Sequence, residues 1–172
     1  MIVERKTHFI AQLEQSYQSV IRNAHQAESQ AAETSEHIRR ESRRKEDSKG
    51  SVEFGRMAAS HKARRERAVK ELETLVAFST KPLRALAETE PVQVGSLIDV
   101  RITDGEGEEE RTLFLLPVGA GNELTGPGGD GFISVITPAS PVGRALTGGY
   151  LGESFDISID GKEREWTIVD LC

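Results

Sequence analysis

GFISVITPASPVGRALTGGYLGE, which spans residues 131–153, is the stretch that decides the fold of the C-terminal half of the chain. The alternation of residues 133–136 predicts a strand that turns an apolar face toward a core. Ser140 then stands where a helix N-cap is expected, and Pro141 stands at the first helical position. Gly148 and Gly149 separate this short helix from the next strand. The stretch therefore predicts a strand, a short helix and a further strand in succession.

The remainder of the C-terminal half predicts short strands joined by turns. Apolar runs favour strands near residues 92–102, 112–116, 155–159 and 166–169. Tight turns are expected at the DGEG sequence of residues 104–107 and at the DG sequence of residues 160–161, and a long glycine-rich loop is expected between Asn122 and Gly131. We therefore expect a small antiparallel β-sheet with one short helix.

The first half of the chain carries a different periodicity. Residues 5–44 contain neither proline nor glycine, and their apolar or small side chains recur in alternating steps of four and three residues. Such steps are the heptad seam of a coiled coil. The seam positions are Leu13, Tyr17, Val20, Ala24, Ala27, Ala31, Thr34 and Ile38. A helix of this length, roughly 60 Å, gains too little from propensity alone and needs a partner against which to bury its seam.

A second helix is predicted to supply that partner. Residues 45–51 are rich in turn formers, and we expect a left-handed conformation at Gly50 and a helix N-cap at Ser51. Helical spacing then resumes and ends near Ser79, before Pro82. The expected seam positions of this helix are Phe54, Met57, Ala58, His61, Ala68, Leu72 and Leu75. Together the helices predict an antiparallel hairpin whose tip lies at about residues 46–51.

The predicted fold class is α+β, with a coiled-coil hairpin over residues 1–80, a linker over 81–90 and the sheet domain over 91–172. The two halves differ in charge. Residues 1–80 hold 15 Lys and Arg against 12 Asp and Glu, a formal charge of +3, whereas residues 81–172 hold 7 against 16, a formal charge of −9. A split of this sign suggests that the halves meet different partners, and the basic half could face nucleic acid.

Composition favours a cytoplasmic protein without a membrane partner. The chain is 37% hydrophobic and 29% charged, and no apolar run approaches the ~20 residues of a membrane-spanning helix. The N-terminus lacks the features of a signal peptide. Cys172 is the single cysteine, which fits a reducing compartment. We expect a monomer that binds no metal or other cofactor of its own, since the four histidines lack zinc-ligand spacing.

Residues 91–171 resemble the C-terminal domain of the bacterial GreA/GreB transcript cleavage factors. The resemblance is carried by the Ser-Pro segment at 140–146, Gly152-Glu153, the entry strand at 94–100 and the Asp-Gly-Lys turn at 160–162. It implies an FKBP-like domain that docks on the rim of the secondary channel of RNA polymerase, with Ser140, Pro141 and Val142 in the docking surface. Ala139 stands where the family usually has an acidic residue or Asn.

The tip also resembles the family, with differences. The family motif Asp-x-Ser-Glu-Asn-Ala-Glu/Asp-Tyr aligns without gaps with residues 47–54, where Asp47 and Glu53 match and Gly50 stands in place of the key Glu. The resemblance implies that the tip carboxylates Asp47, Glu46 and Glu53 act at the catalytic centre of the polymerase. There Asp47 would help to hold a Mg²⁺ ion of the polymerase during cleavage of backtracked RNA. The chain itself is then a regulator and not an enzyme.

Basic residues flank the tip. The resemblance implies that these cations contact phosphates at the 3′ end of the nascent RNA, a contact that is independent of base sequence. The cations are Arg39, Arg40, Arg43, Arg44 and Lys45. Further cations occur on the second helix, at Arg56, Lys62, Arg64, Arg65, Arg67 and Lys70. The alternative interpretation is a solvated helix face whose cations pair with local acids such as Glu36, Glu41 and Glu66.

The sequence supports two functional hypotheses. In the first, the chain is an elongation regulator whose coiled-coil finger enters the secondary channel, where it either stimulates cleavage of backtracked RNA or competes with factors that do. Because Gly50 replaces the family's Glu, the sequence leaves both actions open. In the second hypothesis, the chain is a structural coiled-coil adaptor that self-associates and does not act on the polymerase.

Overall fold

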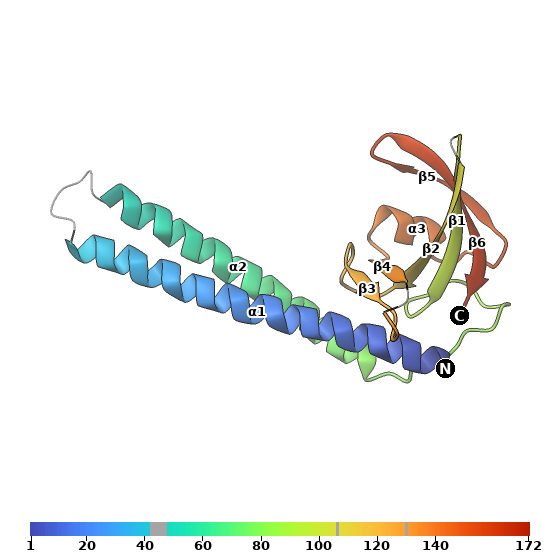
Figure 1. The fold of residues 1–172 in the computed structure, drawn as a ribbon, viewed down its shortest axis with the longest axis horizontal. Coiled ribbons are helices and arrows are strands. Elements are labelled where there is room, and N and C mark those ends of the chain that lie inside the picture. Colours follow the sequence, from blue (N-terminus) through green and yellow to red (C-terminus); the bar gives the residue numbers. More distant parts are fainter. Residues whose placement is uncertain (42–47, 106, 130) are drawn as a thin grey trace. The chain divides into compact units, whose positions relative to one another are not determined.

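The computed structural model describes residues 1–41, 48–105, 107–129 and 131–172 (Figure 1). Their order is α1 (Ile2–Glu41), α2 (Ser48–Ser79), β1 (Leu97–Asp104), β2 (Gly107–Leu115), β3 (Glu123–Thr125), β4 (Phe132–Ile136), α3 (Pro141–Leu146), β5 (Ser154–Ile159) and β6 (Lys162–Leu171). The predicted α+β class, a long helical hairpin followed by a small sheet with one short helix, is confirmed.

The chain divides into two compact units. The coiled-coil unit comprises Glu14–Glu73, and the sheet unit comprises Met1–Leu13 together with Thr74–Cys172. The base of each long helix thus belongs to the sheet unit, whereas the sequence-based ranges assign all of residues 1–80 to the hairpin. The reason is packing, because the first turns of α1 bury apolar side chains against the sheet.

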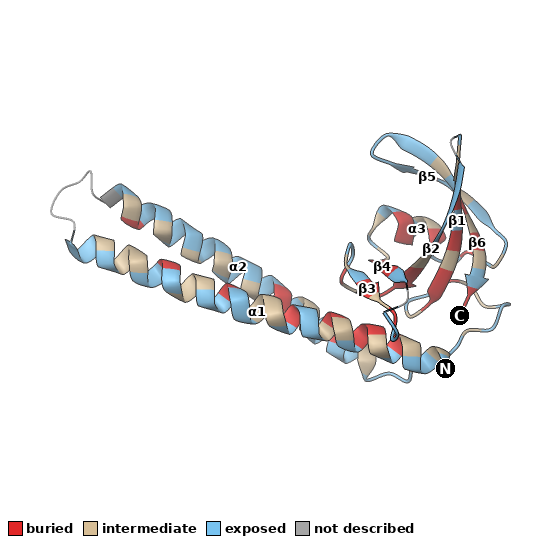
Figure 2. Ribbon diagram, in the orientation of Figure 1, coloured by how far each residue is buried: buried red, intermediate tan, exposed pale blue. Residues whose placement is uncertain are grey.

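The seam of the coiled-coil unit follows the predicted heptad on α1. Tyr17, Ala24 and Ala31 are buried, and the seam positions between and beyond them are half-buried. Figure 2 shows the buried residues of the two helices on the sides that face each other. On α2 the seam is less regular: Ala68 is buried, but Met57 is 44% exposed, so the prediction that places Met57 in the seam is wrong. Small side chains in the middle of the seam let the two backbones approach closely.

Polar contacts across the seam fix how the helices pair. Arg65 Nε donates to Glu28 Oε2 at 2.8 Å, and Ser35 Oγ donates to the backbone oxygen of Ser51 at 2.7 Å. Glu28 precedes Ser35 on α1, whereas its partner Arg65 follows Ser51 on α2. The two helices therefore run antiparallel, as the sequence predicts. Burial, followed by the carboxylate of Glu71 on the opposite helix, raises the pKa of Tyr17.

The start of α2 differs from the prediction. The helix begins at Ser48, so Gly50 and Ser51 are helical residues, and the expected left-handed turn at Gly50 and N-cap at Ser51 are wrong. Residues 46 and 47 of the predicted tip lie outside the described residues. Glycine costs a helix about 1 kcal/mol relative to alanine. Packing offsets this cost here, because Gly50 lies against Ile38 and the Ser51 backbone accepts the hydrogen bond from Ser35.

The six strands described form one sheet in the order β3-β4-β2-β1-β6-β5. The pairs β1–β2, β1–β6, β3–β4 and β5–β6 are antiparallel, the arrangement expected for the sheet as a whole. The pair β2–β4 is parallel, which corrects the expectation of a purely antiparallel sheet. The loop after β2 contains β3, a short strand that the sequence does not indicate. Because β3 pairs antiparallel with β4, the chain reverses once more and β4 runs beside β2 in the same direction.

Each face of the sheet is covered by helix. On one face, Val142 and Leu146 of α3 join a core that contains Val100, Ile102 and Ile168. Complete burial of such a side chain contributes about 1.5–3 kcal/mol. Alternation along β2 turns Phe114 toward the other face, where it is fully buried.

The first turns of α1 cover that second face. The ring of Phe9 meets the ring of Phe114 edge to face, with centroids 6.1 Å apart. Gln12 Oε1 accepts the backbone N–H of Thr125 at 2.8 Å, and His8 Nε2 lies 3.1 Å from the Thr125 carbonyl oxygen. These contacts place residues 1–13 in the sheet unit.

The segment between α2 and β1 lacks helix and strand over residues 81–87, yet its backbone is held in place. Lys6 is 1% exposed, and its Nζ donates to the carbonyl oxygen of Arg84 at 2.8 Å. Burial lowers the pKa of Lys6. Arg84 Nη1 in turn donates to Glu90 Oε2 at 2.7 Å, and the same carboxylate oxygen accepts the N–H of Ala87 at 2.9 Å. Glu90 therefore closes a loop that carries the partner of a buried lysine.

This loop predicts a measurable pH dependence. The hydrogen bonds from Arg84 and then Ala87 lower the pKa of Glu90 from 4.5 to about 2. Because the folded pKa is the lower one, the stabilisation is complete above pH 4.5 and is lost as the pH falls toward about 2. We expect Glu90→Gln to lower the free energy of unfolding at pH 6 and to weaken its decline between pH 4.5 and pH 2, as measured by urea denaturation. The control is the exposed neighbour Glu88→Gln, and equal curves for the two variants would contradict this prediction.

Candidate functional site

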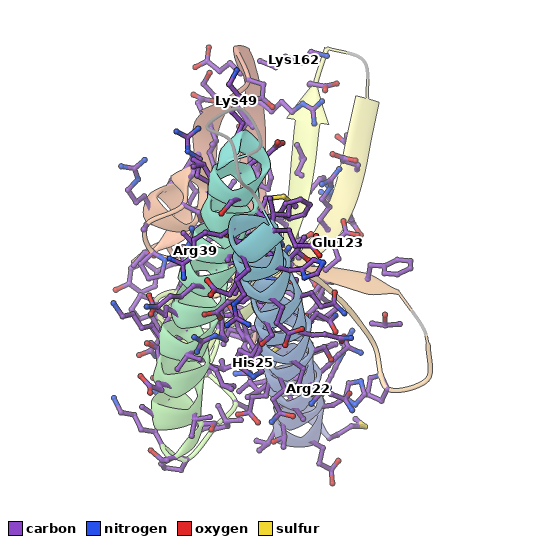
Figure 3. All side chains as sticks on the ribbon, turned by 90° about the vertical axis from the view of Figure 1, so that its left-hand side faces the viewer. Arg22, His25, Arg39, Lys49, Glu123 and Lys162 are labelled. Atoms are coloured by element: carbon purple, nitrogen blue, oxygen red, sulfur yellow. The ribbon has the colours of Figure 1, made fainter. Side chains whose placement is uncertain are left out.

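Part of the predicted tip, and the segment just before it, lie outside the described residues. This holds for the carboxylates of Glu46 and Asp47 and for the cations Arg43, Arg44 and Lys45, which therefore stay predictions. Of the three carboxylates assigned to the tip, only Glu53 is described, and it is an exposed residue of α2, five residues after the helix begins. Figure 3 views the molecule from the side of this end of the hairpin, with Arg39 and Lys49 labelled.

Gly50 faces the opposite helix and not the solvent. A Cβ atom at this position would lie 3.6 Å from Cδ1 and 3.8 Å from Cγ2 of Ile38. Neighbouring positions Lys49 and Glu53 are exposed. A carboxylate at position 50 would thus start against an apolar side chain of α1. Gly50, which stands where the resembled motif has Glu, fits this environment, and Glu53 is an exposed acid of α2 near this end of the hairpin.

The cations before the tip share one acidic partner. Arg39 Nε donates to Glu36 Oε2 at 2.9 Å, and Arg40 Nε donates to Glu36 Oε1 at 3.0 Å. The hydrogen bonds from Arg39 and then Arg40 lower the pKa of Glu36. Two arginines on one carboxylate leave a net positive charge, and the side chains of Arg39 and Arg40 remain 71% and 76% exposed. Local pairing therefore reduces the charge of this segment but does not remove it.

The cations of α2 fall into two groups. Arg65 lies on the seam side, where it binds Glu28 and lowers the pKa of that carboxyl group. Helical spacing agrees with this position, because Arg65 follows His61 of the predicted seam by four residues and precedes Ala68 by three. The remaining exposed cations that form no ion pair within the described part of the chain lie, by helical spacing, on the side of α2 away from the seam. We call Lys49, Arg56, Arg64 and Arg67 the outer basic face.

The predicted docking segment is ordered by its own hydrogen bonds. Ser140 is the N-cap of α3, with its Oγ accepting the N–H of Gly143 at 3.2 Å and donating to the carbonyl oxygen of Thr137 at 2.7 Å. Pro141 is exposed at the first helical position, as predicted. Val142, which the resemblance assigns to the docking surface, is 9% exposed and belongs to the core. Pro141 is thus the exposed member of the three residues that the resemblance assigns to a docking surface.

Gly143 makes this compact cap possible, which leads to a prediction. A Cβ atom at Gly143 would overlap the carbonyl oxygen of Thr137, the acceptor of the Ser140 hydroxyl. We expect Gly143→Ala to lower the free energy of unfolding by at least about 2 kcal/mol, because the loop before α3 must shift. Urea denaturation measures this change. In the matched control Gly105→Ala, the new methyl group meets nothing within 4 Å, and the cost should stay within about 0.5 kcal/mol. Equal stability of the two variants would refute this account of the cap.

The described residues contain neither a metal-binding cluster nor a membrane-spanning helix. Among them, no group of three or more His, Cys, Asp or Glu side chains is arranged to hold a metal ion. Within the same part of the chain, no helix combines the length and apolar character that a bilayer crossing requires.

Similarity to known proteins is detected at the level of structure. The sequence matches no family model and no curated protein. The structure is similar to GreA factor homolog 1 (Gfh1) of Thermus thermophilus, with 17% identity, a TM-score of 0.37, and coverage of 92% of this chain and 94% of that one. A second structure of the transcription factor Gfh1 has 22% identity, a TM-score of 0.38, and coverage of 95% and 93%. Gfh1 of Thermus aquaticus has 16% identity, a TM-score of 0.35, and coverage of 90% and 92%.

Proposed function

We propose that the chain is a transcription elongation regulator of the GreA/GreB type that binds RNA polymerase and competes with cleavage factors for its secondary channel. The observation that carries the proposal is a chain that has both a coiled-coil unit and a sheet unit whose helix α3 is capped by Ser140 with Pro141 at its first position. α1 alone has 40 residues, which corresponds to roughly 60 Å and suffices to reach a distant catalytic centre. The sheet unit would dock through the exposed Pro141, which follows Ser140, the N-cap of α3.

The flanking cations suit a strand of RNA. Arg39, Arg40 and the outer basic face present positive charge that is exposed and only partly neutralised. Contacts of this kind with phosphates are electrostatic and independent of base sequence. This independence is needed because transcripts of any sequence can backtrack into the channel. In this proposal they hold the 3′ end of the nascent RNA against the coiled coil.

The carboxylates at the tip decide the action. A Mg²⁺ ion supplied by the polymerase activates water for cleavage, and such ions usually accept only one or two protein carboxylates in strict geometry. Glu46, Asp47 and Glu53 are the candidates here. Position 50, where the family has its key Glu, offers no carboxylate and faces Ile38. With this acid lost, occupation of the channel without stimulation is the action we propose.

The decisive experiment uses a backtracked elongation complex with Mg²⁺. We expect the wild-type chain to release no short RNA by itself and to slow the release caused by an added GreA/GreB-type factor. Pro141→Ala should weaken this competition about tenfold, because the exposed docking contact is truncated, whereas Pro127→Ala, in an exposed loop, should have no effect. Gel analysis of the released 3′ fragments provides the measurement.

Other outcomes point elsewhere. Release of RNA by the wild-type chain that disappears in Asp47→Ala would establish stimulation and overturn competition. The adaptor hypothesis predicts a different oligomeric mass for the chain and no binding to RNA polymerase. A chain that elutes as a self-associated species and does not co-migrate with core polymerase in size-exclusion chromatography would reject both forms of the proposal, whereas a monomer that co-migrates would reject the adaptor.

A further inference from the structure

A hollow lies on the face of the sheet that α3 covers, toward the β5–β6 hairpin. Its lining comes from β1, β2, β5 and β6 and encloses about 360 Å³. The strand register explains why these side chains converge, since Ile102 pairs with Trp166 and Ile157 pairs with Arg164, and paired residues point to the same side. Ile102, Ile157 and Trp166 form an apolar floor and are 2%, 5% and 5% exposed.

The floor contains a buried donor without a partner. Nε1 of Trp166 is covered from solvent and has no hydrogen-bond partner among the described residues. A buried indole N–H normally finds an acceptor, and leaving it unpaired costs free energy. Trp166 lines the hollow, and a small shift of the side chains that cover its N–H would let a ligand oxygen reach it. Trp166 is also the single tryptophan of the chain.

The rim carries three cations and two acids, Glu109 and Asp160. Arg111, Lys162 and Arg164 line the hollow, and they are three of only seven Lys and Arg residues in a half whose formal charge is −9. Lys162 forms no ion pair within the described residues. Arg111 and Arg164 share Glu109 at 3.2 and 3.4 Å, and Arg164 also binds Asp104 at 3.1 Å. These ion pairs are partly exposed, so an incoming carboxylate can replace Glu109 at little cost.

The hollow adjoins an edge of the sheet. β5 is the last strand in the order, so one side of its backbone faces no other described strand. Ile159 of β5 lies on the rim and is 39% exposed. An extended peptide can pair with such an edge through its main chain while alternate side chains reach a neighbouring pocket.

We propose that this hollow binds an acidic side chain of an extended partner peptide that lies along β5. The carboxylate of the peptide pairs with Lys162 and displaces Glu109 from the arginines, and a peptide oxygen accepts the N–H of Trp166. Apolar residues two positions before and after the acid point to the same side as the acid and pack against Ile157 and Ile159. The inference stands independently of the proposed polymerase function, since it rests on residues outside the predicted docking segment and tip.

The test monitors the indole N–H resonance of Trp166, a single reporter inside the floor, by NMR on the full chain. The probe is the peptide acetyl-Val-Thr-Glu-Thr-Val-amide, and its uncharged match is acetyl-Val-Thr-Gln-Thr-Val-amide. We expect the Glu peptide to shift the indole resonance saturably and to shift backbone amide resonances of β5, and we expect the Gln peptide to bind at least about threefold more weakly. Lys162→Gln should weaken the Glu peptide by a similar factor, whereas Lys81→Gln, the same charge change outside the hollow, should not.

Three results with the peptides and the Lys162 variant would overturn the inference. They are an indole resonance that does not move with the Glu peptide, equal binding of the Glu and Gln peptides, and full insensitivity to Lys162→Gln. Sodium acetate forms the last arm of the experiment. If acetate alone shifts the indole resonance as strongly as the peptide does and leaves the β5 amides unmoved, the site takes a small carboxylate and the peptide proposal fails.

Discussion

The organisation of the N-terminal half depends on a narrow seam of small side chains between α1 and α2. Neither helix can bury its apolar positions alone, and helix propensity without tertiary packing leaves long isolated helices marginal in water. Ala24, Ala31 and Ala68 allow close approach, but each buries little apolar area. The polar contacts Glu28–Arg65 and Ser35–Ser51 therefore contribute more to the pairing and register of the helices than they would in an interface with large apolar side chains. Charged residues are left to occupy the outside, which is what the proposed function requires.

The sequence predicts those features that depend on local spacing. The seam of α1 follows from steps of four and three residues, and the cap of α3 follows from the Ser-Pro pair, because both signals act within one or two turns of chain. The start of α2 could not be predicted in this way. Turn-forming residues around Gly50 signal a break, yet the neighbouring helix supplies Ile38 and Ser35, whose packing and hydrogen bond keep the segment helical. The parallel β2–β4 pair could not be predicted because a three-residue strand, β3, carries the reversal of direction.

The candidate functional residues show the same difference between what local sequence predicts and what long-range contacts decide. Arg65 is indistinguishable from Arg64 and Arg67 by composition; helical spacing places it on the seam, and the structure shows its partner, Glu28, 37 residues away. Val142 looks equivalent to Pro141 in the motif, but α3 turns it into the core. The unpaired indole of Trp166 depends on the groups that surround it in the fold, and no sequence pattern reports them. Residue identity thus supplies the candidates, and long-range pairing sorts them into structural and available groups.

The sheet unit combines two separate segments of the sequence, residues 1–13 and residues 74–172. During synthesis the coiled-coil unit is complete once residue 73 has left the ribosome, and its contacts are within one hairpin. The sheet cannot close until β6 emerges, because Leu97 and Cys172 exchange backbone hydrogen bonds at the very end of the chain. Lys6 must wait for Arg84 and Phe9 must wait for Phe114, and both partners are translated after the coiled-coil unit. Hairpin first and sheet last is therefore the order that this topology imposes on a nascent chain.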